Sequence, residues 1–324
     1  MQIPLELLDF IQKGRKFLIA GHKEPDGDCV GSQIALNSAL KRIGKESILC
    51  SAGPFKRPEI AVYADRFTAV IGARERSGAR AIVLDCSAPH RTGDLAAALA
   101  DLPVAVIDHH VAGEHGPSTP ETPVFLDPLA PSVTVMIFAL IEALGLKPTK
   151  EEAEFLLFGL CTDTGFFRHT DETGAATFEY ASRMIRCGAS PKRVFQHING
   201  GKSLNSRYLL GIQLSRVQAY FEGRLMLTDE EYGETQRFGL EGRDSDALYQ
   251  LLQSVAGVEA IAVIRQETPE NCTIGLRSKD AIDVAAIAAA FGGGGHKNAA
   301  GISIPGTVET VRPQILEAFK RVFR

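Results

Sequence analysis

Short apolar runs and longer helical patterns alternate along the first half of the chain. Continuous apolar runs occur at 17–20 (FLIA), 47–50 (SILC), 81–85 (AIVLD) and 104–108 (VAVID). Runs of this kind, flanked by segments with helical spacing, predict parallel strands that are buried on both faces. The run VFLD at 124–127 is a candidate for an additional strand. The pattern therefore predicts an α/β fold, built on a parallel sheet with flanking helices.

Helical spacing of apolar residues occurs before, between and after these runs. It predicts helices over 4–12, 31–44, 132–145, 151–167 and 174–188. Together with the apolar runs, these helices form a first domain, for which we predict the bounds 1–190.

The pattern changes beyond this first domain. Residues 191–218 are polar, basic and contain glycine, and we interpret them as a linker with helical pieces. The segment 219–228 predicts a β-hairpin with its turn near Gly223. The segment 259–278 contains two β-rich runs joined by a turn at TPEN.

The end of the chain combines a short helix, a glycine loop and a last helix. DVAAIAAAF at 283–291 predicts the short helix, GGGGHKNAAG at 292–301 is the glycine loop, and the last helix ends at Arg324. We therefore predict a smaller α+β domain over 219–324, with an active-site cleft between the two domains.

Composition excludes several classes of protein. The 324 residues are enough for two domains, and 45% hydrophobic with 23% charged residues is the composition of a soluble globular protein. The formal net charge of -4 provides no global basic field for long duplex nucleic acid. No apolar run approaches the roughly 20 residues of a membrane helix. The chain also lacks a cationic start followed by an apolar stretch, so we expect no signal peptide and no membrane association.

Cysteine usage indicates the compartment. The six cysteines are scattered along the chain, and none forms a CxxC pair. Free thiols in a reducing environment fit this distribution better than disulfides do. We therefore expect a cytoplasmic protein, and we leave open whether it forms a homodimer.

Acidic residues and histidines collect at the ends of the predicted strands. Because the carboxyl ends of parallel strands meet at one edge of a sheet, we expect these side chains to converge there. One further acid lies in a helical stretch and approaches from a neighbouring helix. The residues concerned are His22, Asp26, Asp28, Asp85, Asp108, His109, His110 and Asp163.

Each of these residues taken alone has an ordinary structural explanation. Asp28 and Asp85 could cap helices, Asp163 could be the buried partner of an arginine, and His109 could be a satisfied core histidine. A whole cluster of acids at one buried edge is different, because like charges repel unless cations neutralise them. Carboxylate and imidazole ligands favour Mn²⁺, with Mg²⁺ as the second choice. The ligand supply is enough for two metals about 3.5–4 Å apart, bridged by one carboxylate.

The order and spacing of the motifs resemble the DHH phosphoesterase superfamily. The residues that carry the resemblance are HKEPDGD at 22–28, DHH at 108–110 and GLCTDTG at 159–165. The segment LRSKDAIDVAAIAAAFGGGGHKNAAG resembles the C-terminal domain associated with that superfamily. The resemblance covers nearly the whole chain. The chain length is similar to that of a compact bacterial subgroup, the nanoRNases that also remove the 3′-phosphate from phosphoadenosine phosphate.

The resemblance implies a role for each residue of the acidic cluster. One Mn²⁺ takes His22, Asp26 and Asp85, and the other takes Asp28, Asp85, His109 and Asp163, so that Asp85 is the bridge. It also implies that His110 faces the scissile phosphate and that Asp108 orients a histidine from behind. We therefore expect Asp85, Asp108 and His110 to be the catalytic residues.

Basic and glycine-rich segments provide candidate contacts to the substrate. Successive glycines let backbone amides approach an anion closely, although glycines are also common in connections between a helix and a strand. Arginine suits bidentate phosphate contacts. The residues that we expect to bind substrate are Arg91, Arg277, Ser278, Gly293, Gly294, Gly295 and His296. For Arg91 the alternative is a simple ion pair with an acid.

The sequence thus predicts a Mn²⁺-dependent phosphoesterase that hydrolyses short oligonucleotides, from di- to pentanucleotides, to mononucleotides. A second candidate substrate is 3′-phosphoadenosine 5′-phosphate. The alternative enzyme is a phosphodiesterase for cyclic or linear di-AMP, with the same metals and a different pocket. The alternative outside catalysis is a nucleotide-binding regulator, against which the complete ligand set argues.

Overall fold

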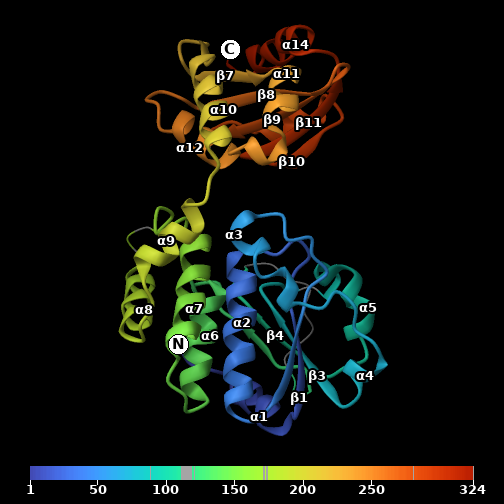
Figure 1. Cartoon of the computed structure of the whole chain (residues 1–324), viewed down its shortest axis with the longest axis vertical. Helices are drawn as coiled ribbons and strands as arrows, with labels where there is room; N and C mark the ends of the chain where they lie inside the picture. The colour runs from blue at the N-terminus through green and yellow to red at the C-terminus, as the bar shows by residue number, and fades with distance from the viewer. Residues whose placement is uncertain are drawn as a thin grey trace. The chain divides into compact units, whose positions relative to one another are not determined.

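The chain forms two compact units, residues 1–200 and 201–324 (Figure 1). The computed structural model describes residues 1–87, 89–110, 119, 121–170, 172, 174–279 and 281–323. The boundary between the units lies within the segment 191–218, for which the sequence predicts a linker with helical pieces. Two helices occupy that segment, α9 (Pro191–Asn199) in the first unit and α10 (Leu204–Ser215) in the second.

The first unit is built on a five-stranded sheet in which all strands are parallel, in the order β2-β1-β3-β4-β5. The apolar runs therefore form the predicted parallel sheet, and the candidate additional strand is its last member. The strands are β1 (Lys16–Ala20), β2 (Glu46–Cys50), β3 (Ala79–Leu84), β4 (Val104–Asp108) and β5 (Val124–Leu126).

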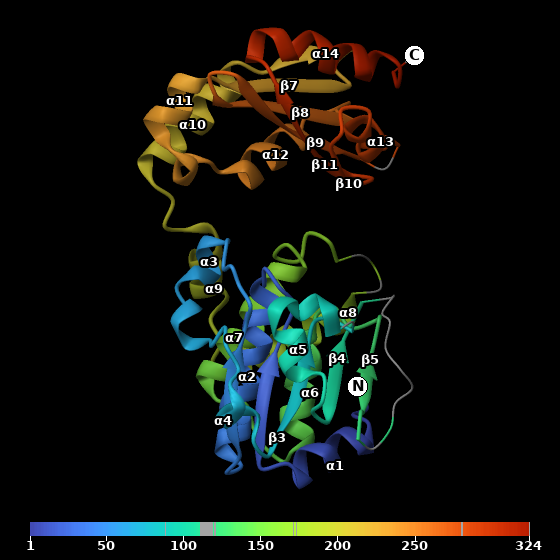
Figure 2. The same cartoon turned by 90° about the vertical axis from the view of Figure 1, so that its right-hand side faces the viewer.

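Helices cover both faces of this sheet. Figures 1 and 2 show α2, α6 and α7 on one side of it and α4 and α5 on the other. Successive residues of β1 alternate between two cores: Phe17 and Ile19 pack in the core of the larger helices, and Leu18 and Ala20 pack in the opposite core. The helices and 3₁₀-helices are α1 (Leu5–Lys13), α2 (Gly27–Arg42), α3 (Pro58–Ala61), η1 (Ala64–Arg66), α4 (Ala73–Arg76), η2 (Pro89–Leu95), α5 (Ala96–Leu99), α6 (Val133–Ala143), α7 (Lys150–Asp163) and α8 (Ala175–Arg186).

Two glycines let α2 and α7 pack at very short distance. A Cβ atom on Gly31 of α2 would lie 2.6 Å from the carbonyl oxygen of Phe155 in α7. A Cβ atom on Gly159 of α7 would lie 2.9 Å from the Cα of Asp28 in α2. Side chains at these positions would force the helices apart. The close approach brings the C-terminal end of α7, with Asp163, to the N-terminal end of α2.

The second unit contains a six-stranded mixed sheet in the order β10-β11-β9-β8-β7-β6. The pair β7 and β8 is parallel, and the other neighbouring strands are antiparallel. The predicted hairpin around Gly223 and the two β-rich runs of 259–278 are part of this sheet. The strands are β6 (Gln218–Tyr220), β7 (Leu225–Glu230), β8 (Ala260–Thr268), β9 (Asn271–Ser278), β10 (Gly294–His296) and β11 (Ala299–Pro305).

Helices α13 (Val284–Ala289) and α14 (Val308–Lys320) cover one face of the second sheet. Helix α12 (Ser245–Gln253) packs on the other face, where Leu248 and Tyr249 contact Ile261 and Val263 of β8. The sequence pattern did not predict α12, nor α11 (Tyr232–Phe238) and η3 (Leu240–Gly242) beside it. The end of the predicted last helix at Arg324 lies outside the described residues.

The glycine stretch differs from the predicted loop. Residues 294–296 form the edge strand β10, which pairs with 299–301 of β11 in an antiparallel hairpin. The short distance between the two strands requires glycine, because a Cβ atom on Gly293 would lie 2.2 Å from the carbonyl oxygen of Gly301.

Within the described parts of the chain, no helix has both the length and the apolar character needed to cross a membrane.

Candidate active site

The predicted acidic cluster forms at the carboxyl edge of the first sheet. Strands β1, β3 and β4 are neighbours in the sheet, and the residues that follow them carry the candidate side chains. The loops after β1 and β3 are joined directly, since the amide of Lys23 donates a 2.6 Å hydrogen bond to the carbonyl oxygen of Arg91. The order of the strands therefore brings the candidate acids and histidines together at one edge of the sheet, as the sequence predicted.

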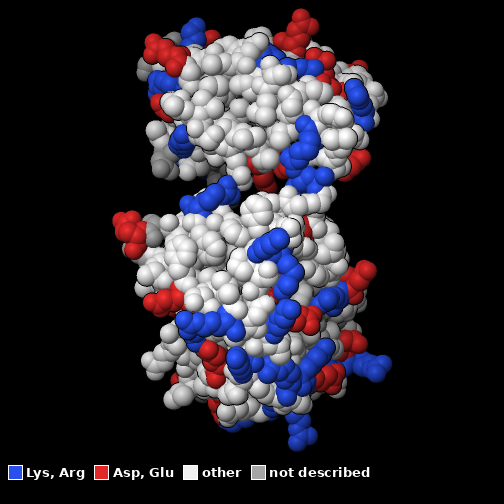
Figure 3. All heavy atoms as spheres, turned by 60° about the vertical axis from the view of Figure 1, so that its left-hand side comes forward, with Lys and Arg blue, Asp and Glu red and all other residues white. Residues whose placement is uncertain are grey.

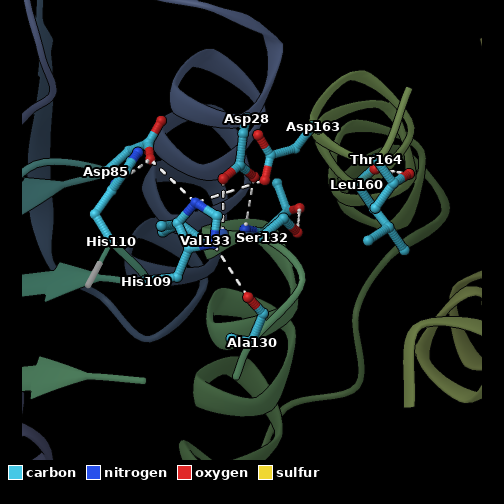
Figure 4. Close-up of polar contacts among 12 residues, drawn as sticks. Asp28, Asp85, His109, His110, Ala130, Ser132, Val133, Leu160, Asp163 and Thr164 are labelled. Carbon is cyan, nitrogen blue, oxygen red and sulfur yellow. Dashed lines mark hydrogen bonds and ion pairs between the residues drawn. The ribbon is translucent and has the colours of Figure 1, made fainter. Parts of the chain in front are cut away.

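His22 and His109 have the same orientation: Nδ1 of each ring faces a backbone carbonyl oxygen, and Nε2 faces a carboxylate. Nδ1 of His22 lies 2.9 Å from the carbonyl oxygen of Lys23, and Nδ1 of His109 lies 3.1 Å from that of Ala130 (Figure 4). Because a carbonyl oxygen only accepts, both Nδ1 atoms carry the proton, and a neutral ring then presents the lone pair of Nε2. Nε2 of His22 lies 3.4 Å from Oδ2 of Asp85, and Nε2 of His109 lies 3.8 Å from Oδ1 of the same residue.

Asp85 lies between the two histidines. Its side chain is buried, and its two carboxylate oxygens face different imidazoles. Its backbone has a φ of 59°, in the left-handed region that aspartate tolerates better than most residues. This conformation directly follows the end of β3 and directs the carboxylate into the cluster, where it could join two cations.

Asp28 has a structural role that the sequence did not reveal. The side chain that caps α2 is Asp26, whose Oδ1 accepts from the amides of Asp28 and Cys29 at 3.1 Å each. Asp28 instead caps another helix: its carboxylate accepts from the amides of Val133 at 2.7 Å and Thr134 at 2.9 Å, at the start of α6. This buried contact fixes the carboxylate and leaves further lone pairs for a cation.

Asp163 completes the cluster from the last residue of α7. Its Oδ2 lies 3.5 Å from Nε2 of His109, on the side of the ring that also faces Asp28 (Figure 4). On the other side of the cluster, Oδ1 of Asp26 lies 3.9 Å from Nε2 of His22. All six predicted metal ligands are therefore brought together.

Burial and mutual repulsion shift the pKa values of the acids upward. Burial, together with the negative charges of Asp163 and Asp26, raises the pKa of Asp28 to about 7. Burial and the charge of Asp28 raise the pKa of Asp85 in the same direction. Burial also raises the pKa of Asp163, against the opposing charge of His109. Ionising these carboxylates is therefore unfavourable in the metal-free protein. A bound cation would offset that unfavourable free energy.

The donor set fits divalent cations with oxygen and imidazole ligands. Ligand atoms of Asp28, His109 and Asp163 lie within 4.8 Å of one another, and those of His22, Cys29 and Asp85 form a second such group. Nε2 of His22 and Nε2 of His109 lie 3.4–3.9 Å from carboxylate oxygens, which is too far for good hydrogen bonds. The lone pairs of these nitrogens therefore face the lone pairs of the oxygens. A third group joins Asp85, His109 and His110, so bound cations would relieve repulsion across the whole cluster.

Cys29 belongs to the second group by distance only. Burial and the charge of Asp85 raise the pKa of its thiol well above the ordinary value. The thiol contacts the side-chain oxygen of Gln33 at 3.5 Å as a weak donor. It is therefore protonated at neutral pH and offers no thiolate, so we interpret it as a small packing residue.

His110 has a different environment from the other two histidines. Its Nδ1 lies 2.7 Å from Oδ1 of Asp108, which also accepts from the amides of His109 and His110. This hydrogen bond raises the pKa of the His110 ring, although burial acts in the opposite direction. The side chain of His110 is 44% exposed, so its Nε2 is available to a ligand. The prediction that Asp108 orients a histidine thus has a direct geometric counterpart.

Two arginines border the cluster. Arg91, in η2, is exposed and has no ion pair with a carboxylate among the described residues, and its charge acts against the pKa rise of His110. Sequence reasoning did not select Arg57, at the start of α3, yet its positive charge acts on Asp163. Only the fold could reveal this arginine, because it belongs to an irregular loop far from any motif.

In the second unit, the candidate residues lie at the β9 end and in the β10–β11 hairpin. Arg277 is half-buried on β9, and Ser278 is buried beside it. The hydroxyl of Ser278 donates to the carbonyl oxygen of Ile282 at 2.7 Å, which closes the turn after the strand. His296 is exposed on β10.

The amides of the first glycines are already engaged. The amide of Gly292 donates to the carbonyl oxygen of Ala289 at 3.0 Å, and that of Gly293 donates to Ala288 at 2.9 Å, where they terminate α13. Gly294 is exposed, with open space where a Cβ atom would stand. A ligand at this hairpin would therefore meet Gly294 and the His296 side chain rather than the amide of Gly293.

Comparisons with known proteins agree with this architecture. Residues 16–160 match the DHH family N-terminal domain, and residues 230–324 match the DHHA1 domain. The bifunctional oligoribonuclease and PAP phosphatase NrnA of Thermus thermophilus is 30% identical over 312 residues, which cover 93% of this chain and 88% of that protein. The NrnA of Bacillus subtilis is 26% identical over 302 residues, covering 92% of each chain.

Two further relatives place the chain within a broader group. The cyclic-di-AMP phosphodiesterase GdpP of Geobacillus thermodenitrificans is 28% identical over 98% of this chain, which spans about half (49%) of that relative. The crystal structure of an exopolyphosphatase-related protein from Bacteroides fragilis has the same fold, with a TM-score of 0.79 and 23% identity over 98% of this chain and 96% of that chain.

The fold and the cluster of acids and histidines are those of a phosphoesterase of a metal-dependent class. The chain belongs to the DHH family, with a DHHA1 domain as its second unit. A solved member of this fold, the RecJ of Thermus thermophilus, is described in complex with Mn²⁺ and aligns with a TM-score of 0.51 at 17% identity, over 98% of this chain and 53% of that one.

Proposed function

We propose that the protein hydrolyses short oligonucleotides, from di- to pentanucleotides, to mononucleotides, and that it uses Mn²⁺. The observation that carries the proposal is the geometry of Asp85, whose two carboxylate oxygens face Nε2 of His22 and Nε2 of His109. A second proposed substrate is 3′-phosphoadenosine 5′-phosphate. The similarity to NrnA of Thermus thermophilus, an oligoribonuclease and PAP phosphatase, supports both substrates.

The protein's own residues would divide the work as follows. His22, Asp26 and Asp85 would hold one cation, and Asp28, Asp85, His109 and Asp163 would hold the other. Bound divalent cations would polarise the phosphate ester and lower the pKa of water. His110, held by Asp108, would donate a hydrogen bond from Nε2 to the phosphate. We assign binding of the rest of the substrate to Arg91, Arg277, Ser278, Gly294, Gly295 and His296, and we leave out Gly293, whose amide is used at the end of α13.

The charge distribution supports a short substrate. On the face that Figure 3 presents, Lys and Arg side chains are interspersed with Asp and Glu over the first unit. With a net charge of -4, the chain offers little of the counterion release that drives binding of long strands. Local contacts to one or two phosphates would then dominate binding, and additional nucleotides would add little.

The alternative substrate is a cyclic or linear di-AMP. The GdpP relatives favour it, since their similarity covers nearly the whole chain. We favour short oligonucleotides because the similarity to NrnA also extends over 88% of that protein's length.

One panel of substrates separates these functions. The purified protein is incubated with Mn²⁺ and pApA, a pentanucleotide, phosphoadenosine phosphate, cyclic di-AMP or a labelled 24-mer. We expect rapid turnover of the first three and a steep fall beyond the pentanucleotide. Faster turnover of cyclic di-AMP than of pApA would support the alternative, and rapid degradation of the 24-mer would contradict both.

The same panel tests the metal. Histidine in a carboxylate-rich site favours Mn²⁺ over Mg²⁺, and Ca²⁺ should support little activity. Equal turnover with Mg²⁺ and Mn²⁺ would show that the metal preference is wrong. Full activity after exhaustive chelation would show that no dissociable metal is required.

A further inference from the structure

Arg277 on β9 is held in place by an aromatic ring that belongs to another element. Residues 273, 275 and 277 of β9 are the less buried ones of an alternating pattern, so they share the face of the sheet opposite α13 and α14. On this face, Tyr249 of α12 reaches β9. The guanidinium carbon of Arg277 lies over the Tyr249 ring, 4.6 Å from the ring centroid.

The remaining contacts of Arg277 leave its charge available. Its Nη1 donates to the carbonyl oxygen of Leu276 at 2.9 Å. Within the described chain it has no carboxylate partner, unlike Arg243 and Arg216 of the same unit, which pair with acids. A guanidinium has five N–H donors, so most of the fork is free to bind an anion. Stacking on a ring fixes its plane without consuming those donors.

Gly275 explains why the ring fits where it does. A Cβ atom at this position would lie 2.0 Å from the hydroxyl oxygen of Tyr249 and 3.3 Å from its Cζ. The tyrosine therefore lies directly against the backbone of β9, two residues before Arg277. Tyr249 is buried, with only 6% of its surface exposed, so the ring is itself held firmly by α12 and β8.

We propose that Tyr249 is a positioning residue, which holds the Arg277 guanidinium in the orientation that binds a substrate phosphate. This proposal rests on the proposed function, because Arg277 is assigned there to substrate binding. Tyr249 touches no substrate in this account. Its ring restricts the rotamers of a long side chain, so that less conformational freedom is lost when the phosphate binds.

Kinetics with pApA test the proposal. Tyr249→Leu removes the aromatic face, and we expect KM to rise about fivefold to tenfold with kcat changed less than twofold. Tyr249→Phe keeps the ring and should keep KM within twofold of the wild type. Leu251→Ala, an exposed position on the same helix, is the matched control and should leave both constants unchanged.

A double variant distinguishes positioning from general damage to the domain. If Tyr249 acts through Arg277, adding Tyr249→Leu to Arg277→Ala should raise KM no further than Arg277→Ala alone. Multiplied effects of the two substitutions would overturn the proposal, and so would a wild-type KM in Tyr249→Leu. Failure of the proposed function has another signature, the absence of turnover of pApA by the wild type.

Two further measurements test the proposal without any assay of enzymatic activity. Arg side-chain Nε–H relaxation in NMR should show Arg277 more mobile in Tyr249→Leu than in Leu251→Ala, and equal mobility would overturn the proposal. Gly275→Ala should lower Tm, and adding Tyr249→Phe should restore most of the loss, since the nearest remaining ring atom lies 3.3 Å away. No recovery in that double variant would contradict the contact between the ring and the strand.

Discussion

Asp108 and His110 are joined by a 2.7 Å contact between Oδ1 of the carboxylate and Nδ1 of the ring. The same oxygen accepts from two backbone amides, which hold the carboxylate in one orientation. These hydrogen bonds lower the pKa of Asp108 against the effect of burial, so the group is ionised at neutral pH. An ionised partner favours the charged form of His110, which explains the raised pKa of that ring.

Asp108→Asn should lower kcat by about 10²–10³-fold, the range for losing one positioned hydrogen-bond donor to the transition state, with a smaller change in KM. Activity that depends on protonated His110 falls as pH rises through its raised pKa. Without the negative charge that pKa drops, so the alkaline fall should begin at lower pH in the variant. A kcat profile from pH 5.5 to pH 9 measures this, with Asp101→Asn as an exposed control. An unchanged alkaline limb would show that Asp108 does not set the protonation of His110.

Asp85→Asn should reduce turnover by several orders of magnitude, because the uncharged side-chain amide of asparagine neutralises neither cation. The fold should survive, since asparagine also tolerates the φ of 59° at this position. In the presence of a chelator at pH 8, the variant should be more stable than the wild type. It lacks the buried carboxylate of Asp85, which the neighbouring carboxylates repel. Thermal unfolding and metal analysis measure both effects. A variant with more than a tenth of the wild-type turnover would show that Asp85 is not the bridge.

Metal-free protein should lose stability as pH rises. The folded-state pKa of Asp28 is about 7 against an ordinary value of 3.8, so the folded protein holds this proton through a window in which the unfolded chain releases it. Stability is therefore greatest at low pH and declines between these two values, by an amount on the order of a few kcal/mol for the cluster.

Urea unfolding in chelator at pH 5 and pH 8 measures this decline. Added Mn²⁺ should reverse it, because cations bind the deprotonated carboxylates and release protons. Asp28→Asn provides the matched variant, in which the dependence on pH should be weaker. Greater stability of the metal-free wild type at pH 8 than at pH 5 would contradict the raised pKa values.

Gly31→Ala should weaken the metal site from a distance. The new Cβ atom would lie 2.6 Å from a backbone oxygen of α7, so the two helices must separate, at a cost of about 1–3 kcal/mol. Separation moves Asp163 away from Asp28, and we expect weaker Mn²⁺ binding together with a lower Tm. Gly211→Ala is the control, since Gly211 lies in α10 with open space around it and alanine favours a helix. Equal effects of the two substitutions would mean that the α2–α7 contact does not position the site.

Local patterns along the chain were sufficient for much of the fold and for the acids and histidines that meet at one edge of the first sheet. Continuous apolar runs are a direct consequence of strands buried on both faces, and His22, Asp85 and His109 lie within two residues of the ends of such runs. Any parallel sheet then brings these residues to one edge. The helices that the pattern did not predict are short ones: α3, α4 and α5 in the first unit, and α11 and α12 in the second. Of these, α12 carries the Tyr249 that contacts Arg277.

The amino-acid sequence by itself determined which residues enter the acidic cluster, because burial periodicity and strand ends are local properties. The tertiary structure decided what each one does there. Asp28 caps α6 rather than its own helix, and the two oxygens of Asp85 face different histidines. The amide of Gly293 serves the end of α13 instead of remaining free. Each of these outcomes depends on which donor meets which acceptor across elements distant in the chain, and that pairing follows from helix and sheet packing, which no local pattern records.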